Sequence, residues 1–328
     1  MKEIGSFIEL ELPKGQEWYG GDKGVARLNT GRAAIWHAFR LTGASAIWLP
    51  YYQCETVRQF LQRKHCEIKY YHQDRDFNPI DLTPSGDEAV LFVNYFGVMS
   101  FSRMETLAQP FCNVIIDNCQ AFFCPPVPGT YSVYSARKFH GVADGAYVIG
   151  PEAERFVDEY PQSYSSDTAV FLLKRIEYGC EGAGYESRTI NEDRIDSEDI
   201  MKMSYLTHAM LDGADYQKNR AKRKENYRTA CDLFDGINLI KPSCHLAGDT
   251  IPMVYPLVIE DENLHQCLLK AKHFQGHWWN YITKEMPEST FEYWLSKYLI
   301  PITIDQRYGE SEIRYVHSVV ECALKHRI

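Results

Sequence analysis

The sequence predicts an α/β protein: a three-layer fold in which a mostly parallel β-sheet is covered on both faces by helices. Between residues 29 and 149, short apolar segments of strand type alternate with segments of helical periodicity. The strand candidates are apolar at consecutive positions, which is typical of parallel strands that are buried on both faces. After Pro151 the pattern changes to long helical segments, and a second, shorter group of strands and helices follows from residue 253.

The length and composition of the chain predict two domains. The chain has 328 residues and 45% hydrophobic content, and single hydrophobic cores stop growing at roughly 250 to 300 residues. We expect a large domain over residues 1–240, with an N-terminal arm at about 1–26 and a helical bridge at about 152–240. A smaller C-terminal α+β domain is expected over residues 241–328.

The elements expected in the first half follow one another at short intervals. Asn29 or Thr30 can cap a helix that includes Phe39, and Gly43 is expected to end it, because glycine readily adopts the left-handed conformation found after helix C-termini. The other expected elements are strands at 46–49, 67–71, 89–94, 113–117, 130–135 and 145–149, and helices at 55–64 and 103–108.

The second half is expected to contain mainly helices. Acidic residues dominate the stretch 186–199, which predicts an exposed connection between two helices. The elements expected in this half are helices at 156–160, 169–178, 200–233, 263–274 and 311–325, and strands at 253–259 and 298–302.

The net charge argues against nucleic acid or an anionic membrane as the main partner. The formal charge is −9, whereas both partners require a basic surface. A basic run at 218–224 is interpreted as a solvated helix face, with an anion-binding patch as the alternative. The first residues carry acids where a signal peptide needs an apolar stretch, and no segment has the length and apolarity of a membrane span. We therefore expect a cytoplasmic protein.

The cysteines and histidines indicate neither a disulfide framework nor a metal site. The ten cysteines are scattered without paired spacing, which in a chain of this length is typical of reduced, buried thiols. His273 and His277 stand one helical turn apart, but a third ligand at a suitable spacing is lacking. We expect no bound metal.

A carboxylate and a lysine at the ends of two predicted strands indicate the chemistry of the site. Asp117 closes the run Val-Ile-Ile-Asp, and Lys138 follows the strand at 130–135. An enzyme that uses pyridoxal 5'-phosphate (PLP) needs this pair, because the lysine forms a Schiff base with the cofactor and the acid faces the pyridinium nitrogen. The same lysine can then act as general base and acid. We therefore expect Asp117 and Lys138 to be catalytic.

Other strand ends and one helix start supply candidates for the remaining contacts with PLP. Ligands of open parallel sheets lie beyond the carboxyl ends of the strands, and a helix N-terminus suits a phosphate. The candidates near the ring are Asn94, Gln120, which could donate to the phenolic oxygen, and the stacking aromatic Tyr51 or Tyr52, of which Tyr52 is preferred. The candidates near the phosphate are Gly31, Arg32 and Ser135.

Eight short motifs occur in a characteristic order over most of residues 27–325. They are Gly-Arg-Ala-Ala-Ile (31–35), Leu-Pro-Tyr-Tyr (49–52), Asn-Tyr-Phe-Gly (94–97), Asp-Asn-Cys-Gln (117–120), Ser-Ala-Arg-Lys (135–138), Asp-Gly-Ala (144–146), Tyr-Pro-Leu (255–257) and Leu-Ile-Pro-Ile (299–302). This set resembles the DegT family of PLP-dependent sugar aminotransferases. The resemblance implies the aspartate-aminotransferase fold, also called PLP fold type I.

The resemblance also implies an assembly and a reaction. It implies a homodimer whose two active sites lie at the subunit interface. The amino donor would be glutamate, as is usual in the family, and the acceptor a keto sugar, often linked to a nucleotide. Carried onto this chain, the resemblance assigns the Schiff-base lysine to Lys138, the pyridinium acid to Asp117, its amide neighbour to Gln120, the phosphate helix to Gly31 and Arg32, and the phosphate hydroxyl to Ser135.

Two departures from the family pattern concern the site. A gapless alignment on Pro50 places Cys54 at the position of the usual stacking aromatic, so the choice of Tyr52 assumes a rearranged loop. The family's Gly-Tyr-Asn-Tyr-Arg segment, which reaches the partner subunit's phosphate, corresponds to residues 184–196, where the sequence differs. These departures weaken the prediction of the substrate more than the prediction of the cofactor.

Several residues have structural roles as alternatives. Asp117 can cap a turn, the strand-end aromatics can simply pack, and a structural role is favoured for His140 over assistance in proton transfer. The alternatives for the whole chain are a PLP-dependent sugar dehydratase and a non-catalytic regulatory or assembly protein of the same fold. Related dehydratases replace the lysine with histidine, so the intact Lys138 disfavours the first alternative.

Overall fold

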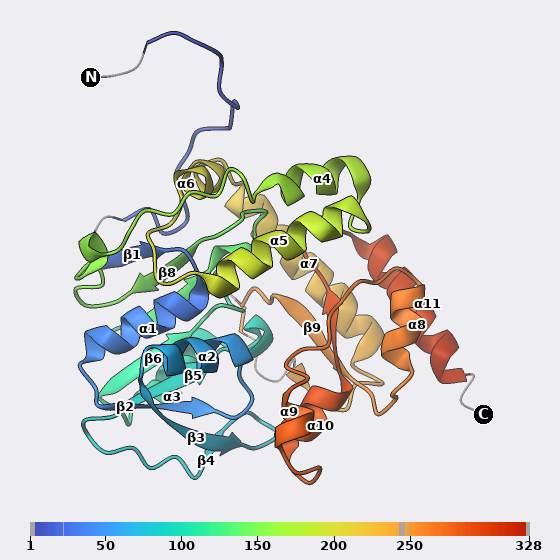
Figure 1. Ribbon diagram of the computed structural model, residues 1–328. Helices are drawn as coiled ribbons and strands as arrows, with labels where there is room; N and C mark the ends of the chain where they lie inside the picture. The colour runs from blue at the N-terminus through green and yellow to red at the C-terminus, as the bar shows by residue number, and fades with distance from the viewer. Residues whose placement is uncertain (1–3, 22, 243–246, 249, 326–328) are drawn as a thin grey trace.

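The central feature of the molecule is an eight-stranded sheet in the order β1-β8-β7-β6-β5-β2-β3-β4 (Figure 1). The computed structural model describes residues 4–21, 23–242, 247–248 and 250–325. The strands of the sheet are β1 (Val25–Leu28), β2 (Ala46–Pro50), β3 (Glu67–Gln73), β4 (Pro79–Ile80), β5 (Ala89–Val93), β6 (Asn113–Asp117), β7 (Tyr131–Ser135) and β8 (Ala146–Ile149).

The middle of this sheet is parallel. Strands β7, β6, β5, β2 and β3 run in the same direction, whereas β8 is antiparallel to β7 and to β1. Every residue of β5 is buried, which agrees with the consecutive apolar positions that predicted a sheet covered on both faces. Because the carboxyl ends of parallel strands meet at one edge, the loops after β2, β5, β6 and β7 converge there.

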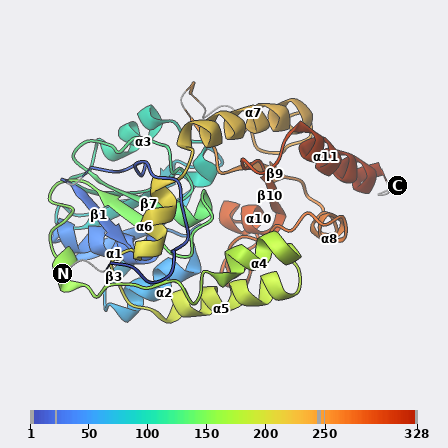
Figure 2. The ribbon, with the colours of Figure 1, turned by 90° about the horizontal axis from the view of Figure 1, so that it is seen from above.

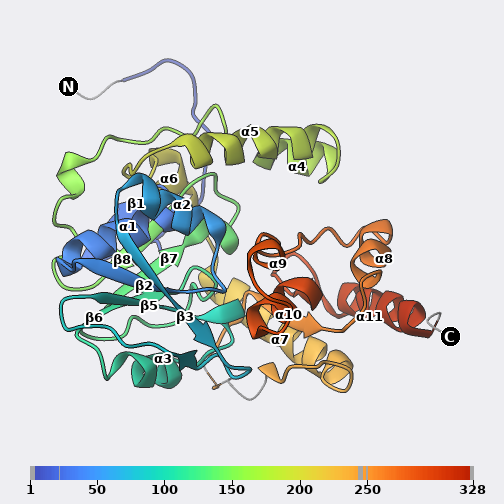
Figure 3. The ribbon, with the colours of Figure 1, turned by 60° about the horizontal axis from the view of Figure 1, so that its bottom comes forward.

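Helices cover both faces of the sheet. Helix α1 (Gly31–Thr42) packs against β6, β7 and β8, with α2 (Glu55–Arg63) beside it, and α3 (Phe101–Ala108) lies on the opposite face (Figure 3). The limits predicted for the first helix are confirmed. The Thr30 hydroxyl caps its start, and Gly43 follows its end with a φ of 67°, in the left-handed region that favours glycine.

The acidic stretch 186–199 is helical over most of its length, so its prediction as an exposed connection was wrong. Helix α5 (Ala183–Ser197) runs along α4 (Val170–Tyr178), and the two helices lie side by side (Figure 2). The residues that α5 buries are Gly184, Ser187, Asn191 and Ile195. Because this buried face is mostly small and polar, the helix leaves little hydrophobic periodicity in the sequence.

The run predicted as one helix at 200–233 consists of two helices. These are α6 (Tyr205–Asp212) and α7 (Tyr216–Phe234), and the side chain of Asp215 caps the start of the second one. The basic run on α7 is not a uniformly solvated face, because Arg223 is buried with 2% of its surface exposed.

A second, two-stranded sheet follows. Strands β9 (Val254–Val258) and β10 (Leu299–Thr303) pair antiparallel. The helix expected at 156–160 is only a short 3₁₀ turn, and the helix expected at 263–274 is shortened to α8. The remaining elements are η3 (Val157–Glu159), α8 (Leu264–Lys270), α9 (Ile282–Glu285), α10 (Phe291–Tyr298) and α11 (Glu310–Lys325). Among the helices of the described ranges, none has the length and apolar character needed to cross a membrane.

Candidate active site

The strand-end loops and the start of α1 form the candidate site at the carboxyl edge of the parallel strands. The predicted site residues at the strand ends are Tyr52, Asn94, Asp117, Gln120, Ser135 and Lys138, and those at the start of α1 are Gly31 and Arg32.

Asp117 is a buried carboxylate at the end of β6, with 5% of its surface exposed. Its Oδ1 accepts a hydrogen bond from the backbone N–H of Cys119 at 3.0 Å, and its Oδ2 accepts one from Nε2 of Gln53 at 3.3 Å. In the described part of the chain, no basic side chain forms an ion pair with it. Burying a carboxylate without a cation is costly. A protonated ring nitrogen beside Asp117 would therefore be stabilised.

Lys138 ends a short 3₁₀ turn, η2 (Ala136–Lys138), directly after β7. Its side chain is exposed, and no carboxylate of the described residues pairs with it. The guanidinium of the neighbouring Arg137, by contrast, pairs with Glu192 of α5. The amine of Lys138 is thus accessible to solvent. The 3₁₀ turn that carries Lys138 is linked to α5 by the ion pair between Arg137 and Glu192.

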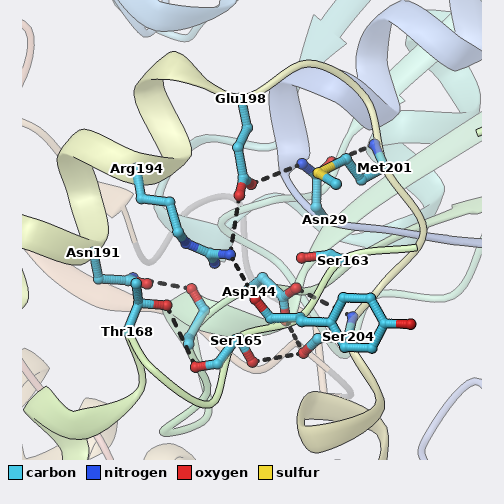
Figure 4. A network of polar contacts seen from close by, with 12 residues as sticks. Asn29, Asp144, Ser163, Ser165, Thr168, Asn191, Arg194, Glu198, Met201 and Ser204 are labelled. Carbon is cyan, nitrogen blue, oxygen red and sulfur yellow. Dashed lines mark hydrogen bonds and ion pairs between the residues drawn. The ribbon is translucent and has the colours of Figure 1, made fainter. Parts of the chain in front are cut away.

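The loop that follows Lys138 is anchored by the buried carboxylate of Asp144 (Figure 4). Asp144 accepts hydrogen bonds from Ser204 N at 3.1 Å, from Ser204 Oγ at 2.8 Å and from the hydroxyl of Thr207. These donors lie at the start of α6, where free N–H groups and the helix dipole favour a negative charge. From α5, Asn191 donates to the carbonyl of Ala143 at 3.1 Å. The loop is therefore held by two helices.

The amides of Asn94 and Gln120 connect the strand-end loops. Nδ2 of Asn94 donates to Oδ1 of Asn118 at 3.1 Å, and Oε1 of Gln120 accepts from the backbone N–H of Phe96 at 2.7 Å. Phe96 has a φ of 58°, which a non-glycine residue adopts only when its surroundings impose it. Both amides thus shape the edge of the site. Their direct contact with a cofactor stays a prediction.

Gly31, Ser135 and Cys119 meet at the start of α1. A Cβ at Gly31 would lie 2.7 Å from Sγ of Cys119 and 3.8 Å from Cβ of Ser135, so only glycine leaves enough room. The Thr30 hydroxyl accepts from the N–H of Ala33, so the first two N–H groups of the helix, at Gly31 and Arg32, are the ones that an anion could use. The guanidinium of Arg32 lies 2.6 Å from Oδ1 of Asp196 on α5. An anion bound to Arg32 would therefore compete with Asp196.

Cys119 is buried close to both predicted catalytic residues. Burial, followed by the carboxylate of Asp117, raises the pKa of its thiol, whereas the ammonium of Lys138 acts in the opposite direction. The thiol is therefore neutral at ordinary pH, and it donates a hydrogen bond to the carboxylate of Asp117. Asp117 and Lys138 thus both act electrostatically on this thiol.

Aromatic side chains from the C-terminal region close over the end of β2. The ring of Trp279 lies 4.5 Å from that of Tyr52, and the hydroxyl of Tyr281 donates to the carbonyl of Gln53 at 2.8 Å. Tyr52 is fully buried, and its hydroxyl has no hydrogen-bond partner among the residues described. Tyr52 is thus part of the aromatic cover, and its stacking on a cofactor ring stays a prediction.

His140 lies in an apolar environment behind the lysine turn. Its ring centroid is 5.1 Å from those of Phe122 and Tyr216. Burial, and then the nearby Arg223, lowers the pKa of His140 to about 4. A neutral, aromatic-packed imidazole supports the structural role that we expected for it.

Two residues of this site were missed by the sequence analysis. Gln53 contacts Asp117, and Asp196 contacts Arg32. The position of Gln53, directly after Tyr52 at a strand end, is a signal that could have identified it. For Asp196 the sequence offers no such signal, because the pairing depends on how α5 crosses the sheet edge.

Solved structures of known proteins resemble most of the chain. A sugar aminotransferase from Micromonospora echinospora is 16% identical, with a TM-score of 0.60 over 91% of this chain and 87% of that one. A DegT DnrJ EryC1 StrS aminotransferase from Brucella abortus is 13% identical, with a TM-score of 0.56 over 90% and 85%. The Escherichia coli GDP-4-keto-6-deoxy-D-mannose-3-dehydratase, with bound hydrated PLP, is 14% identical, with a TM-score of 0.61 over 90% and 87%. The chain has PLP fold type I.

This fold type I assignment confirms the predicted fold class, the mostly parallel sheet of the aspartate-aminotransferase kind. Comparison of the sequence with protein-family models and with curated proteins finds no match. At identities this low, structural similarity establishes only the fold. The activity has to be inferred from the residues of the site.

Proposed function

We propose that this protein is a PLP-dependent aminotransferase. The observation that supports the proposal most is Asp117, a buried carboxylate that accepts hydrogen bonds only from neutral donors and has no ion-pair partner among the described residues. A protonated pyridine nitrogen would supply a positive charge there. The accessible amine of Lys138, on the neighbouring strand end, supports the same assignment.

The residues of the site fit the parts of this cofactor. Asp117 would hold the proton on the ring nitrogen, and the start of α1, with Gly31, Arg32 and Ser135, would bind the phosphate. When bound, PLP would supply an electron sink for the negative charge that develops at the substrate Cα. Lys138 would bind the cofactor covalently and then move the proton at that carbon. Gln120, Asn94 and Tyr52 would complete the wall around the ring.

The acceptor proposed is a keto sugar, often nucleotide-linked, with glutamate as the usual donor. Support comes from the sugar aminotransferase and the sugar dehydratase of the same fold. The product would be an amino sugar, of the kind used in surface polysaccharides. The division into a large domain over 1–240 and a small domain over 241–328 and the cytoplasmic location stay predictions.

A dehydratase is the second candidate, because the Escherichia coli enzyme shares the fold. The accessible Lys138 favours transamination, since a lysine at this position can return the proton to the cofactor carbon. A non-catalytic member of the fold is the third candidate. The buried Asp117 and the accessible Lys138, at the ends of the neighbouring strands β6 and β7, argue against it.

The amino-donor half-reaction tests the proposal. The protein is loaded with PLP, and glutamate is added without an acceptor while the visible absorbance is followed. We expect the yellow form to disappear and 2-oxoglutarate to appear in stoichiometric amount. Lys138→Ala should lose this reaction, whereas Lys174→Ala, a change to a lysine that bonds Ser187 within the α4–α5 pair, should keep it. A wild-type protein that binds PLP but releases no oxo acid with any amino donor would refute the proposal.

We also propose a homodimer in which PLP is bound near the interface. Residues 184–196 contact their own chain at Arg32, Arg137 and Ala143, so this segment covers its own sheet edge. Large apolar side chains exposed on α4 and α5 are Val170, Leu173, Ile176, Tyr178, Tyr185 and Ile190. Such a surface is typical of a protein interface.

Sedimentation at several concentrations, with and without PLP, tests the dimer. PLP bound across an interface would stabilise the dimer by mass action. Ile176→Asp should produce a monomer, whereas Ile80→Asp, a change to an exposed isoleucine of β4, should not. A wild-type monomer that transaminates normally would refute the dimer.

A further inference from the structure

Gln53 is held in one orientation beside Asp117. Its Nε2 donates to Oδ2 of Asp117 at 3.3 Å, and its Oε1 accepts from the backbone N–H of Cys54 at 2.7 Å. Rotating the amide by half a turn would place oxygen against carboxylate and N–H against N–H. The two partners therefore fix which end of the amide faces the acid.

The backbone of Gln53 is fixed as well. Its carbonyl accepts from the hydroxyl of Tyr281 at 2.8 Å, and its N–H donates to the carbonyl of Tyr51 at 3.0 Å. Only 3% of the residue is exposed. Hydrogen bonds therefore fix both the backbone and the side chain of Gln53. They hold its Nε2 donor at a constant position relative to Oδ2 of Asp117.

Few groups act directly on the carboxylate of Asp117. Its donors in the described structure are the N–H of Cys119, the amide of Gln53 and the thiol of Cys119, and no basic side chain pairs with it. Hydrogen bonds to a carboxylate favour its ionised form and lower its affinity for a proton. A proton shared between Asp117 and a ring nitrogen would therefore be pushed toward the nitrogen by Gln53.

We propose that Gln53 is a positioning residue of the reaction, which keeps the shared proton on the cofactor's ring nitrogen by donating a hydrogen bond to Oδ2 of Asp117. The inference rests on the proposed function, because it needs PLP bound opposite Asp117. It adds a residue to the site and a chemical task for that residue. The hydrogen bond from Gln53 stabilises the charge on the carboxylate, and a protonated pyridine ring is the stronger electron acceptor.

Two substitutions test the donor to Asp117. Gln53→Met removes both that donor and the acceptor for the N–H of Cys54, whereas the neutral ring of Gln53→His has one N–H donor and one acceptor nitrogen. Only the histidine keeps an N–H at about the reach of the glutamine amide. Gln62→Met, a change to an exposed glutamine of α2, is the matched control.

The readout is the ¹⁵N chemical shift of the ring nitrogen of labelled PLP in each holoenzyme, together with the dissociation constant of PLP. We expect the wild type, Gln62→Met and Gln53→His to show a protonated nitrogen. Gln53→Met should move the resonance toward that of unprotonated pyridine and weaken PLP binding about tenfold. If Gln53→Met does not fold, Gln53→Thr replaces it, because a threonine hydroxyl is too short to reach Asp117.

Two results would overturn the inference. If Gln53→Met and Gln53→His give the same resonance, whether normal or shifted, the donor to Asp117 has no separate effect. If the wild-type protein forms no covalent adduct of PLP with Lys138, the proposed function fails and the inference fails with it. Labelling of Lys138 in the wild type therefore distinguishes the two failures.

Discussion

The guanidinium of Arg32, at the start of α1, and the carboxylate of Asp196, on α5, are joined by a 2.6 Å ion pair. Arg32 is nearly buried, with 8% of its side chain exposed, whereas Asp196 is exposed. The pair places a negative charge beside the helix start proposed to receive the cofactor phosphate. Bound phosphate and Asp196 would then compete for one arginine.

Asp196→Asn is expected to strengthen PLP binding severalfold, because the phosphate no longer has to displace a carboxylate from Arg32. The dissociation constant is measured by fluorescence titration, first with PLP and then with inorganic phosphate as competitor. Asp193→Asn removes the same charge from the exposed face of the same helix and should leave binding unchanged. Weaker PLP binding in Asp196→Asn would show that the ion pair supports the site.

Asp117→Asn is expected to keep the fold and lose most of the half-reaction with glutamate. A neutral amide cannot hold the ring-nitrogen proton as an ion pair, and the expected loss is a hundredfold or more, roughly 3 kcal/mol of barrier. Without cofactor, the variant should be at least as stable as the wild type, since a buried, unpaired charge is removed. Single-turnover rates and thermal unfolding are the measurements. A variant with wild-type rates would make Asp117 a turn residue.

Asp144→Asn is expected to destabilise the protein by about 3 kcal/mol, because the amide cannot accept all three hydrogen bonds from Ser204 and Thr207. Thermal unfolding of the cofactor-free protein measures the loss. Ser163→Ala is the control at a nearby buried hydroxyl, which has no hydrogen-bond partner among the described residues. That change should be nearly neutral, and equal losses in both variants would contradict the role of Asp144 as an anchor.

Stability is expected to fall with decreasing pH partly through His273. Burial, and then the neighbouring His265, lowers the pKa of His273 in the folded protein to about 4, below the usual 6.5. The unfolded chain therefore binds the proton first, and the stabilisation present above about pH 6.5 is lost as the pH falls toward 4. His273→Gln keeps an acceptor for the N–H of Thr303 and should flatten this slope. Melting temperatures of the wild type and the variant from pH 7 to 4.5 measure this pH dependence. If the variant loses stability as steeply as the wild type, His273 does not contribute to it.

The parts of the fold that depend on local pattern were predictable from the sequence. The end of β6 at Asp117 and the limits of α1 at Thr30 and Gly43 follow from apolar runs and from capping chemistry. Helix α5 was not predictable, because its buried face is small and polar. Its packing depends on contacts such as Asn191 with Ala143, which the sequence does not reveal.

The same distinction applies to the site. The placement of Asp117 and Lys138 at one sheet edge could be predicted, because Asp117 ends its strand, Lys138 follows the neighbouring one, and parallel strands bring their ends together. The bond from Gln53 to Asp117 was missed, because it depends on a side-chain orientation set by Cys54 N and Tyr281. Local order along the chain thus indicates which strand ends carry chemistry, and tertiary packing decides how their side chains are oriented.

Borohydride reduction of the protein after addition of PLP, followed by peptide mapping, tests the central claim most directly. The reduction makes the bond between the lysine and the cofactor permanent. We predict one pyridoxyl group per chain, on Lys138, and none on that peptide when Lys138 is replaced by arginine. A pyridoxyl group on another lysine, or no labelling at saturating PLP, would contradict the assignment of this site.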